Sequence, residues 1–335
     1  MGILLVSGET GAKQAFAELM KHDIGQEWIV LGPETNYEGI RTQVSEASLV
    51  LCGMSSVPEN AEDEIFSAHF AAYYGIPFGF YADTFGVVGR PNFQHLLEQT
   101  NFIFTVTAAE ADKIQAKFKK IQVVACGNPI WEKYAARKID PQKIRQTRQV
   151  PEDSRLIISP GGKISGLNML LWSTILSAIQ RLPDYNIRLW LAPHPGDSTP
   201  DYFYRNLLQE YEALSQILAR TGHLEDLGLE AADLVIQSAS TIGIIAACWG
   251  IPVIDFIDKA HADRLERITG QRNWPPTEAG ASLLCTHHEE MVHLIASLLK
   301  HRGQPVLSEH QNKFMPISPE GTAIKKMLAT IRQYL

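Results

Sequence analysis

The segment at 232–254, ADLVIQSASTIGIIAACWGIPVI, constrains the fold of this chain more than any other stretch. It contains two short apolar runs, Leu234–Gln237 and Val253–Phe256, with the Val- and Ile-rich composition of strands in a parallel sheet covered on both faces. Between them lie a turn of small residues and an apolar helix, which Gly250 ends because glycine is favoured just past a helix C-terminus. The segment therefore predicts a strand, a helix and a second parallel strand of an α/β fold.

The same alternation of strands and helices runs through both halves of the 335 residues and predicts two parallel sheets. A polar, proline-punctuated segment at 128–152 lies between the halves and indicates an interdomain linker. We therefore expect an N-terminal domain at 1–127, a C-terminal domain at 153–318 and a last helix at 319–335 that can pack back on the N-terminal domain. The expected strands are 3–7, 28–31, 49–52, 77–81, 102–106, 122–125, 156–159, 187–192, 234–237 and 253–256.

Composition narrows the class of protein. The formal net charge of −7 argues against nucleic acid as a partner, because phosphate backbones need a basic surface. No apolar run reaches the length of a transmembrane helix, and the first apolar run is too short for a signal peptide. The four cysteines are far apart and lack metal-site spacing, which is typical of thiols in a reducing compartment. We expect a cytoplasmic protein without a transmembrane segment, for which peripheral contact with a membrane stays open.

Three loops of the second half follow predicted strands, so their residues should meet at one edge of the sheet, where α/β proteins bind ligands. In SPGGKISG, Gly161 and Gly162 allow close backbone approach and Lys163 adds a positive charge, although the loop could also be an ordinary turn. In LAPHPGD, His194 stands between two prolines. It can donate to a phosphate there, or be a surface histidine in a proline turn.

The third loop is the turn of small residues before the apolar helix. It carries the hydroxyls of Ser238, Ser240 and Thr241, and hydroxyls beside free helix N–H groups suit a phosphate. The alternative is that Ser240 or Thr241 only caps the helix. Three such loops at one edge of a sheet indicate a phosphate site more strongly than any one of them.

Candidate acid–base residues follow strands of the first half. Asp83 comes directly after a buried strand and ranks first as a general base, and Glu9, beside a glycine-rich turn, ranks second. Ser55 and Arg90, with Asp258 of the second half, are candidates for contacts with a sugar or an acceptor. The alternatives are a turn aspartate at Asp83, an ordinary helix start at Glu9 and acidic surface at Asp258.

Several short motifs resemble those of GT-B glycosyltransferases. They are the GNP sequence at 127–129, the HPGD loop, and the Ser/Thr turn before a helix that ends in G-x-P-V. The pairs His194–Pro195 and Ser240–Thr241 are also similar to nucleotide-binding motifs of bacterial sialyltransferases and capsule-polymer transferases. Non-hydrolysing UDP-N-acetylglucosamine 2-epimerases share the GT-B architecture. The resemblance implies an α/β fold of two Rossmann-like parallel-sheet domains that face each other across a cleft.

The resemblance also implies that a nucleotide-sugar donor binds the C-terminal domain, that the acceptor is a saccharide or another hydroxyl compound, and that no cofactor or metal is tightly bound. It assigns the diphosphate and base to Gly161, Gly162, Lys163, His194, Ser238, Ser240 and Thr241. One position departs from the pattern. Many members of the family carry a ribose-binding Glu five residues before the Gly of the G-x-P motif, and this chain has Ile245 there.

Three functions follow as hypotheses. The first is an inverting GT-B-type glycosyltransferase with a first-domain carboxylate as base. The second is a sugar-nucleotide 2-epimerase or hydrolase, which would turn over its substrate without an acceptor. The third is a non-catalytic binding or scaffold protein of GT-B shape, which the departure at Ile245 favours. Because function depends on the site and not on the fold, the fold alone does not choose among them.

Overall fold

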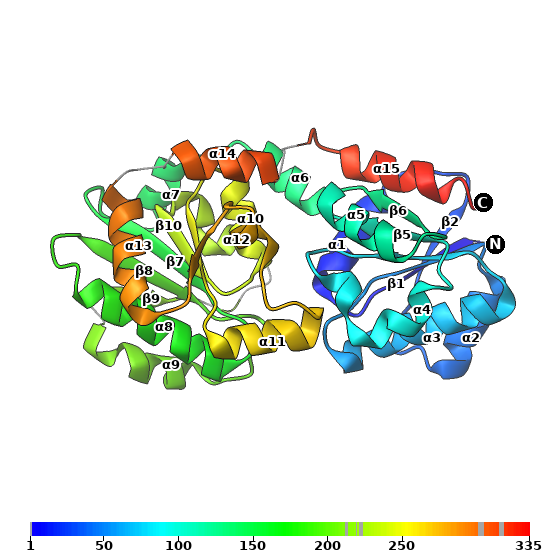
Figure 1. Cartoon of the computed structure of the whole chain (residues 1–335), viewed down its shortest axis with the longest axis horizontal. Helices are drawn as coiled ribbons and strands as arrows, with labels where there is room; N and C mark the ends of the chain where they lie inside the picture. Colours follow the sequence, from blue (N-terminus) through cyan, green and yellow to red (C-terminus); the bar gives the residue numbers. More distant parts are fainter. Residues whose placement is uncertain (1, 212–213, 219, 221–223, 301–304, 315–317) are drawn as a thin grey trace. The chain divides into compact units, whose positions relative to one another are not determined.

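The computed structural model describes residues 2–211, 214–218, 220, 224–300, 305–314 and 318–335. The chain divides into two compact units, each built on its own sheet (Figure 1). Unit 1 comprises Met1–Ala136, Glu266–Arg272 and Ser318–Leu335, and unit 2 comprises Arg137–Leu265 and Asn273–Ile317. Both units are α/β, as the alternating pattern predicts.

Unit 1 contains a six-stranded parallel sheet in the order β2-β1-β3-β4-β5-β6. Its strands are β1 (Gly2–Val6), β2 (Glu27–Val30), β3 (Leu49–Cys52), β4 (Phe78–Tyr81), β5 (Phe102–Thr105) and β6 (Gln122–Ala125). Its helices are α1 (Thr10–Leu19), α2 (Tyr37–Glu46), α3 (Pro58–Tyr74), α4 (Gln94–Leu97), α5 (Ala108–Lys117), α6 (Pro129–Ala136) and α15 (Thr322–Ile331), with short 3₁₀ turns at Val87–Gly89 and Pro91–Phe93.

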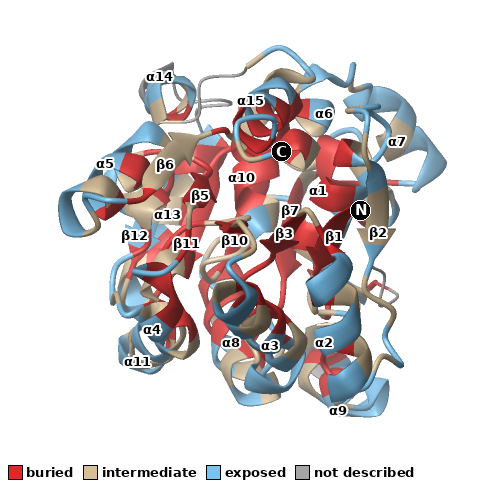
Figure 2. Ribbon diagram, turned by 90° about the vertical axis from the view of Figure 1, so that its right-hand side faces the viewer, coloured by how far each residue is buried: buried red, intermediate tan, exposed pale blue. Residues whose placement is uncertain are grey.

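Two apolar layers form the core of unit 1, because successive side chains of a strand point to opposite faces of the sheet. On one face, Ile3 and Leu5 of β1 pack with residues of α1 and α15. On the other face, Leu4 and Val6 pack with residues of α2 and α3. Figure 2 shows the central strands as buried, with the exposed residues on helices and loops. The loops at the strand ends are therefore anchored to a rigid base.

Unit 2 repeats this plan with a parallel sheet in the order β12-β11-β10-β7-β8-β9. Its strands are β7 (Arg155–Pro160), β8 (Ile187–Ala192), β9 (Ser215–Ile217), β10 (Leu234–Gln237), β11 (Val253–Phe256) and β12 (Leu283–Cys285). Its helices are α7 (Pro141–Thr147), α8 (Ser165–Gln180), α9 (Asp201–Leu208), α10 (Thr241–Cys248), α12 (Pro275–Glu278), α13 (His288–Lys300) and α14 (Pro305–Phe314). Helix α11 (Lys259–Thr269) begins in unit 2, and its last residues count with unit 1.

Every strand predicted from the sequence is present, and β9 and β12 are additional. Both additional strands have three residues and lie at the edges of their sheet, where pairing on one side is enough to hold them. The segment predicted as a linker, 128–152, contains α6 and α7, and the boundary between the units falls after Ala136. The alternation of strands and helices also predicts a helix at 202–213, and the structure has the shorter helix α9, which ends at Leu208. Helices α11 and α14 were not predicted.

The last helix, α15, belongs to unit 1, where it packs against α1 and α6 (Figure 1, red). Met327 and Ile331 of α15 are fully buried in the core layer that also contains β1. The two oxygens of the Glu132 carboxylate on α6 accept the N–H of Ala323 at 3.0 and 3.1 Å, and so give a partner to one N–H group in the first turn of α15. Among the residues that the structure describes, no helix combines the length and apolar character needed to cross a bilayer.

Candidate functional site

The three candidate phosphate loops of unit 2 follow neighbouring strands, because β10, β7 and β8 are adjacent in the sheet. The N–H of Gly161, after β7, donates to the carbonyl of Ala192, at the end of β8, over 2.9 Å. A Cβ placed on Gly196 would lie 3.2 Å from His194 Nδ1 and 3.7 Å from Lys163 Cγ. The structure therefore brings the glycine loop and the HPGD loop into contact at one edge of the sheet.

A buried asparagine of α8 organises these two loops. Asn168 is 2 % exposed, accepts the N–H of Gly162 at 2.6 Å and donates to the Gly162 carbonyl at 2.9 Å. It also donates to Asp197 Oδ2 at 3.1 Å, and the hydroxyl of Tyr204 donates to the same oxygen. Burial opposes ionisation of Asp197, but hydrogen bonds from Tyr204 and Thr199 outweigh it and lower the pKa of this carboxyl.

The two glycines of this loop differ in their surroundings. A Cβ on Gly161 would come within 3.0 Å of Asn168 and of the Trp172 ring, so this glycine is needed for close packing on α8. Gly162 is exposed, and a Cβ there would meet nothing nearer than 3.8 Å. There is space beside the Cα of Gly162, but its N–H and its carbonyl both hydrogen-bond to Asn168, so a ligand would meet backbone groups that already have partners. The backbone of Gly161 is enclosed by protein.

The HPGD loop fixes the tautomer of its histidine. His194 Nδ1 accepts the N–H of Gly196 at 2.9 Å, so in the neutral ring the proton resides on Nε2, which acts as a donor. The His194 carbonyl accepts the N–H of Asp197 at 2.9 Å, which closes the turn. His194 and Lys163 are both half-buried, so each can present a polar end to solvent.

The turn before α10 is built as a helix cap. Ser240 Oγ accepts the N–H of Ile242 at 3.3 Å, and Gln237 Oε1 accepts the N–H of Gly243 at 2.8 Å. The capping alternative for Ser240 is therefore present in the structure. Two of the N–H groups at this helix terminus have protein partners, while Ser240 still has a hydroxyl hydrogen to donate. Thr241 is exposed and Ser238 is half-buried.

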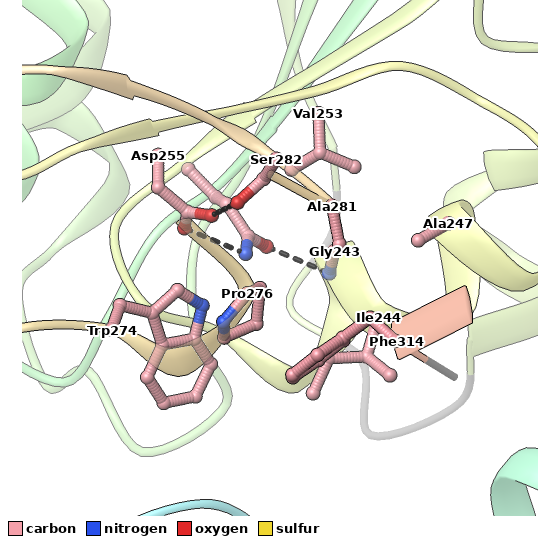
Figure 3. Close-up of a pocket in the computed structure, with 11 residues that line it drawn as sticks. Gly243, Ile244, Ala247, Val253, Asp255, Trp274, Pro276, Ala281, Ser282 and Phe314 are labelled. Atoms are coloured by element: carbon pink, nitrogen blue, oxygen red, sulfur yellow. Dashed lines mark hydrogen bonds between the residues drawn. The ribbon is translucent and has the colours of Figure 1, made fainter. Parts of the chain in front are cut away.

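A fully buried carboxylate, Asp255 of β11, holds this turn in place through hydrogen bonds. It accepts the N–H of Ala239 at 3.0 Å. It also accepts an amide hydrogen of Gln237 at 3.0 Å and the hydroxyl of Ser282 at 2.6 Å (Figure 3). Ala239 has a φ of +48°, a left-handed conformation that is unusual for a residue with a Cβ. Burial raises the pKa of Asp255 to about 6. The sequence suggested that Asp255, with Asp258, could bind a sugar or a divalent ion, or be acidic surface. The structure instead buries Asp255 completely within β11.

The cavity drawn in Figure 3 lies beside Asp255 and holds about 10 Å³, close to the space for one water molecule. It is lined in part by Ile244, Trp274 and Phe314, and it is too small for a nucleotide. Ile245, the position where the resemblance implies a ribose-binding Glu, is 3 % exposed and packed in the interior. The side chain at this position of α10 therefore offers no ribose contact.

Asp258 serves the start of α11. Its Oδ1 accepts the N–H of His261 at 2.9 Å and lies 2.6 Å from His261 Nδ1. His261 is buried and packs edge-on against Phe256 at 5.3 Å between ring centroids. These contacts give Asp258 a helix-capping role within unit 2.

In unit 1, the candidate residues gather at the carboxyl ends of the adjacent strands β1, β3 and β4. Glu9, after β1, accepts the N–H of Ser56 at 2.9 Å and the Ser56 hydroxyl at 2.6 Å. Arg90 Nη1 lies 3.9 Å from Glu9 Oε2. Asp83, after β4, lies against the first turn of α1, so close that a Cβ on Gly11 would be 2.0 Å from Asp83 Oδ2. The two candidate bases, Glu9 and Asp83, therefore flank the same helix terminus.

A third carboxylate in this cluster, Glu64 of α3, was not predicted. It accepts the N–H and the hydroxyl of Ser55, both at 2.7 Å, and the N–H of Gly8 at 3.1 Å. Burial raises the pKa of Glu64 to about 7, although these hydrogen bonds oppose the increase. The signal in the sequence was its spacing, because Glu64 lies on the buried face of α3 together with Ala61, Ala68 and Ala71.

No protein-family model matches this chain, and no curated protein sequence matches it. Solved structures do match along its whole length. A Staphylococcus aureus MnaA–UDP co-structure has a TM-score of 0.71 and 16 % identity, covering 100 % of this chain and 97 % of that one. The UDP-GlcNAc 2-epimerase from Neisseria meningitidis bound to UDP-GlcNAc has a TM-score of 0.66 and 13 % identity, covering 99 % and 100 %. A glycosyltransferase from Rickettsia africae has a TM-score of 0.65 and 14 % identity, covering 99 % and 98 %.

At these identities the likeness is one of fold. The two six-stranded parallel sheets correspond to the two Rossmann-like domains of GT-B and UDP-GlcNAc 2-epimerase-like structures. The two Rossmann-like parallel-sheet domains that the resemblance implies are thereby confirmed.

Proposed function

We propose that this chain is a nucleotide-sugar enzyme of GT-B type, in which unit 2 binds the nucleotide diphosphate and unit 1 supplies the acceptor-side groups. The main support for this proposal is the position of three loops, which follow the adjacent strands β7, β8 and β10. The loop after β7 carries Lys163 and the loop after β8 carries His194, and both side chains lie close to Gly196. The similar S. aureus and N. meningitidis structures hold UDP and UDP-GlcNAc, which supports a uridine diphosphate as the first ligand to test.

The proposed donor contacts are electrostatic. Lys163 and the N-terminus of α10 would offset the charge that develops on the leaving diphosphate, without a tightly bound metal. His194 Nε2 and the Ser240 hydroxyl would donate to phosphate oxygens. Ser240 can do this while it caps α10, because capping uses its lone pair and leaves its hydrogen.

Our first candidate reaction is inverting transfer of the sugar to an acceptor hydroxyl. A carboxylate of unit 1, Asp83 or Glu9, would remove the acceptor proton as the bond to the diphosphate breaks. The second candidate is epimerisation or hydrolysis of the nucleotide sugar, which the likeness to the N. meningitidis epimerase favours. Product analysis separates them, because only the second reaction consumes the donor when no acceptor is present.

The test of nucleotide binding is thermal unfolding with UDP, CDP, GDP and dTDP and their common sugar conjugates, with and without magnesium. A ligand that binds only the folded state raises the midpoint of unfolding by mass action. We expect a shift with one nucleotide family, lost in His194→Ala and Lys163→Ala. His293→Ala is the matched control, because His293 is an exposed histidine on α13 of the same unit. The absence of a shift with every one of these nucleotides would contradict the proposal and favour the non-catalytic alternative.

A further inference from the structure

We propose that Arg90 and Glu9 together bind one alcohol hydroxyl of a neutral, polyhydroxylated acceptor. This inference rests on the proposed function and names the chemical class of its acceptor. It concerns unit 1 alone, so it can be tested separately from nucleotide binding in unit 2.

Arg90 is the starting observation. It is 7 % exposed, and its Nε and Nη1 are both buried without a hydrogen-bond acceptor among the residues that the structure describes. Buried polar groups in folded proteins nearly always have partners, and a guanidinium that lacks them is costly to bury. Burial lowers the pKa of Arg90, while the carboxylates of Asp83, Glu9 and Glu64 oppose this change. The guanidinium therefore faces several carboxylates and still has unused donors.

The distance between the two groups defines what fits. Arg90 Nη1 and Glu9 Oε2 are 3.9 Å apart, too far for a direct hydrogen bond. One oxygen atom can lie about 2.8 Å from both atoms and so bridge them. That oxygen must accept from the guanidinium and donate to the carboxylate at the same time. An alcohol hydroxyl or a water can do both.

An anionic oxygen does not meet this requirement. A phosphate or carboxylate oxygen accepts from Arg90 but has no hydrogen for Glu9, and its charge repels that carboxylate. Asp83 and Glu64 add to the repulsion, because both act on Arg90 from nearby. The surroundings of Arg90 therefore favour a neutral ligand that carries several hydroxyls.

Glu9 is held in place for this contact. Ser56 donates its N–H and its hydroxyl to the two oxygens of Glu9, and the neighbouring Ser55 is fixed by Glu64. Two further hydroxyls near Asp83, Tyr81 Oη and Thr84 Oγ1, are buried without partners among the described residues.

The experiment is saturation-transfer NMR on the full chain with glucose, galactose, mannose and N-acetylglucosamine, each at millimolar concentration. Glucuronate and glucose 6-phosphate are the matched anionic probes. Each titration is run with and without the nucleotide found by thermal unfolding. We expect at least one neutral sugar to bind the wild type more tightly than either anion.

The variants are Glu9→Gln and Arg90→Lys, which keep the size or charge of the side chain. Because each weakens a charge-assisted hydrogen bond, we expect the dissociation constant of the bound sugar to rise about tenfold. Glu38→Gln and Arg41→Lys on α2 are matched controls, and they should leave binding unchanged. Thermal unfolding of every variant shows whether it is folded.

Three results would overturn the inference. They are tighter binding of an anionic sugar than of its neutral parent, binding that survives both variants, and no binding of any sugar, in which case bound water alone fills the gap. If one of these results is found while a nucleotide still raises the midpoint of thermal unfolding, the further inference is wrong and the proposed function is retained. If a sugar binds but no nucleotide changes the midpoint of thermal unfolding, the proposed function is wrong. The inference that unit 1 binds a sugar is then retained.

Discussion

Glu64 accepts both the backbone N–H and the hydroxyl of Ser55, each at 2.7 Å, from a fully buried position on α3. This carboxylate ties the loop after β3 to the loop after β1, where it also accepts the N–H of Gly8. Glu64 therefore holds together the loops that carry the candidate residues of unit 1, although no hydrogen bond between Glu64 and Arg90 is found among the described residues. The protonation of Glu64 should therefore affect the stability of unit 1, which can be measured.

The first prediction concerns pH. Burial raises the pKa of Glu64 from its ordinary value of 4.5 to about 7, so the folded state holds this proton more tightly than the unfolded state. The free energy of unfolding should therefore fall as pH rises from about 4.5 to about 7, by at most about 3 kcal/mol from this group. Glu64→Gln should remove that part of the pH dependence in urea unfolding between pH 4.5 and 8.

The matched control is Glu62→Gln, an exposed residue of the same helix. The free energy of unfolding of Glu64→Gln is subtracted from that of the wild type at each pH. The difference reports on Glu64 alone, because other buried carboxyls such as Glu110 and Asp255, whose pKa values burial also raises, are present in both proteins. A difference between wild type and Glu64→Gln that stays constant over this pH range contradicts the prediction.

The second prediction concerns the contact between Gly11 and Asp83. Ala at position 11 would place its Cβ 2.0 Å from Asp83 Oδ2, so Gly11→Ala should cost about 1–3 kcal/mol of unfolding free energy. In an Asp83→Ala background the conflict is gone, and the same substitution should gain about 0.5–1 kcal/mol from helix propensity. The measurement is a double-mutant cycle by chemical unfolding.

Gly166→Ala on α8 is the control for this cycle, because a Cβ there meets nothing within 4 Å. Additive effects of Gly11→Ala and Asp83→Ala would show that Asp83 does not lie against the first turn of α1.

The third prediction concerns the cap of α15. Glu132→Ala removes the carboxylate that accepts the Ala323 N–H, and should cost about 1–2 kcal/mol. Hydrogen exchange should quicken throughout Thr322–Ile331, because the start of this helix loses its only described side-chain partner on α6. Glu38→Ala, in the exposed first turn of α2, should leave exchange in α15 unchanged. If the rates of hydrogen exchange in α15 are unchanged in Glu132→Ala, the prediction is wrong, and apolar packing alone accounts for the stability of this helix.

The fourth prediction concerns Ile245. Restoring the acidic residue of the GT-B pattern with Ile245→Glu should destabilise unit 2 by about 3 kcal/mol or more, because this position is 3 % exposed. Nucleotide affinity should not improve. Ile245→Val, the conservative control, should cost about 0.5–1.5 kcal/mol. The prediction would be wrong if the Ile245→Glu variant folds and a nucleotide raises its midpoint of thermal unfolding more than that of the wild type. That result would show that the side chain at position 245 can reach a ligand.

The sequence predicted the main strands because their apolar runs are long enough to stand out from their surroundings. It missed β9, Ser215–Ile217, because a three-residue edge strand with two polar side chains has no such pattern. It also missed the helical character of 128–152, where Pro141 begins α7 at the first helical position and does not break it.

Candidate site residues on loops were found by their place after a strand, and Glu9, Asp83, Lys163 and His194 all lie at strand carboxyl ends. The residues that hold those loops were missed. Glu64, Asn168 and Asp255 are buried polar groups on regular elements, and their partners come from segments far along the chain. A local pattern shows only that such a residue interrupts an apolar face, because its partners depend on the folded arrangement.

Helix α15 completes a core layer whose first residue is Ile3 of β1, so segments from the two ends of the described chain belong to one compact unit. During synthesis, β1 to β6 and α1 leave the ribosome long before Met327 and Ile331 exist to cover their apolar face. At about 5–20 residues per second, that interval lasts roughly ten seconds or more. The first half of the molecule must therefore wait, with part of its interior exposed, until unit 2 has been made, and a chaperone that recognises apolar surface would find its substrate in that interval.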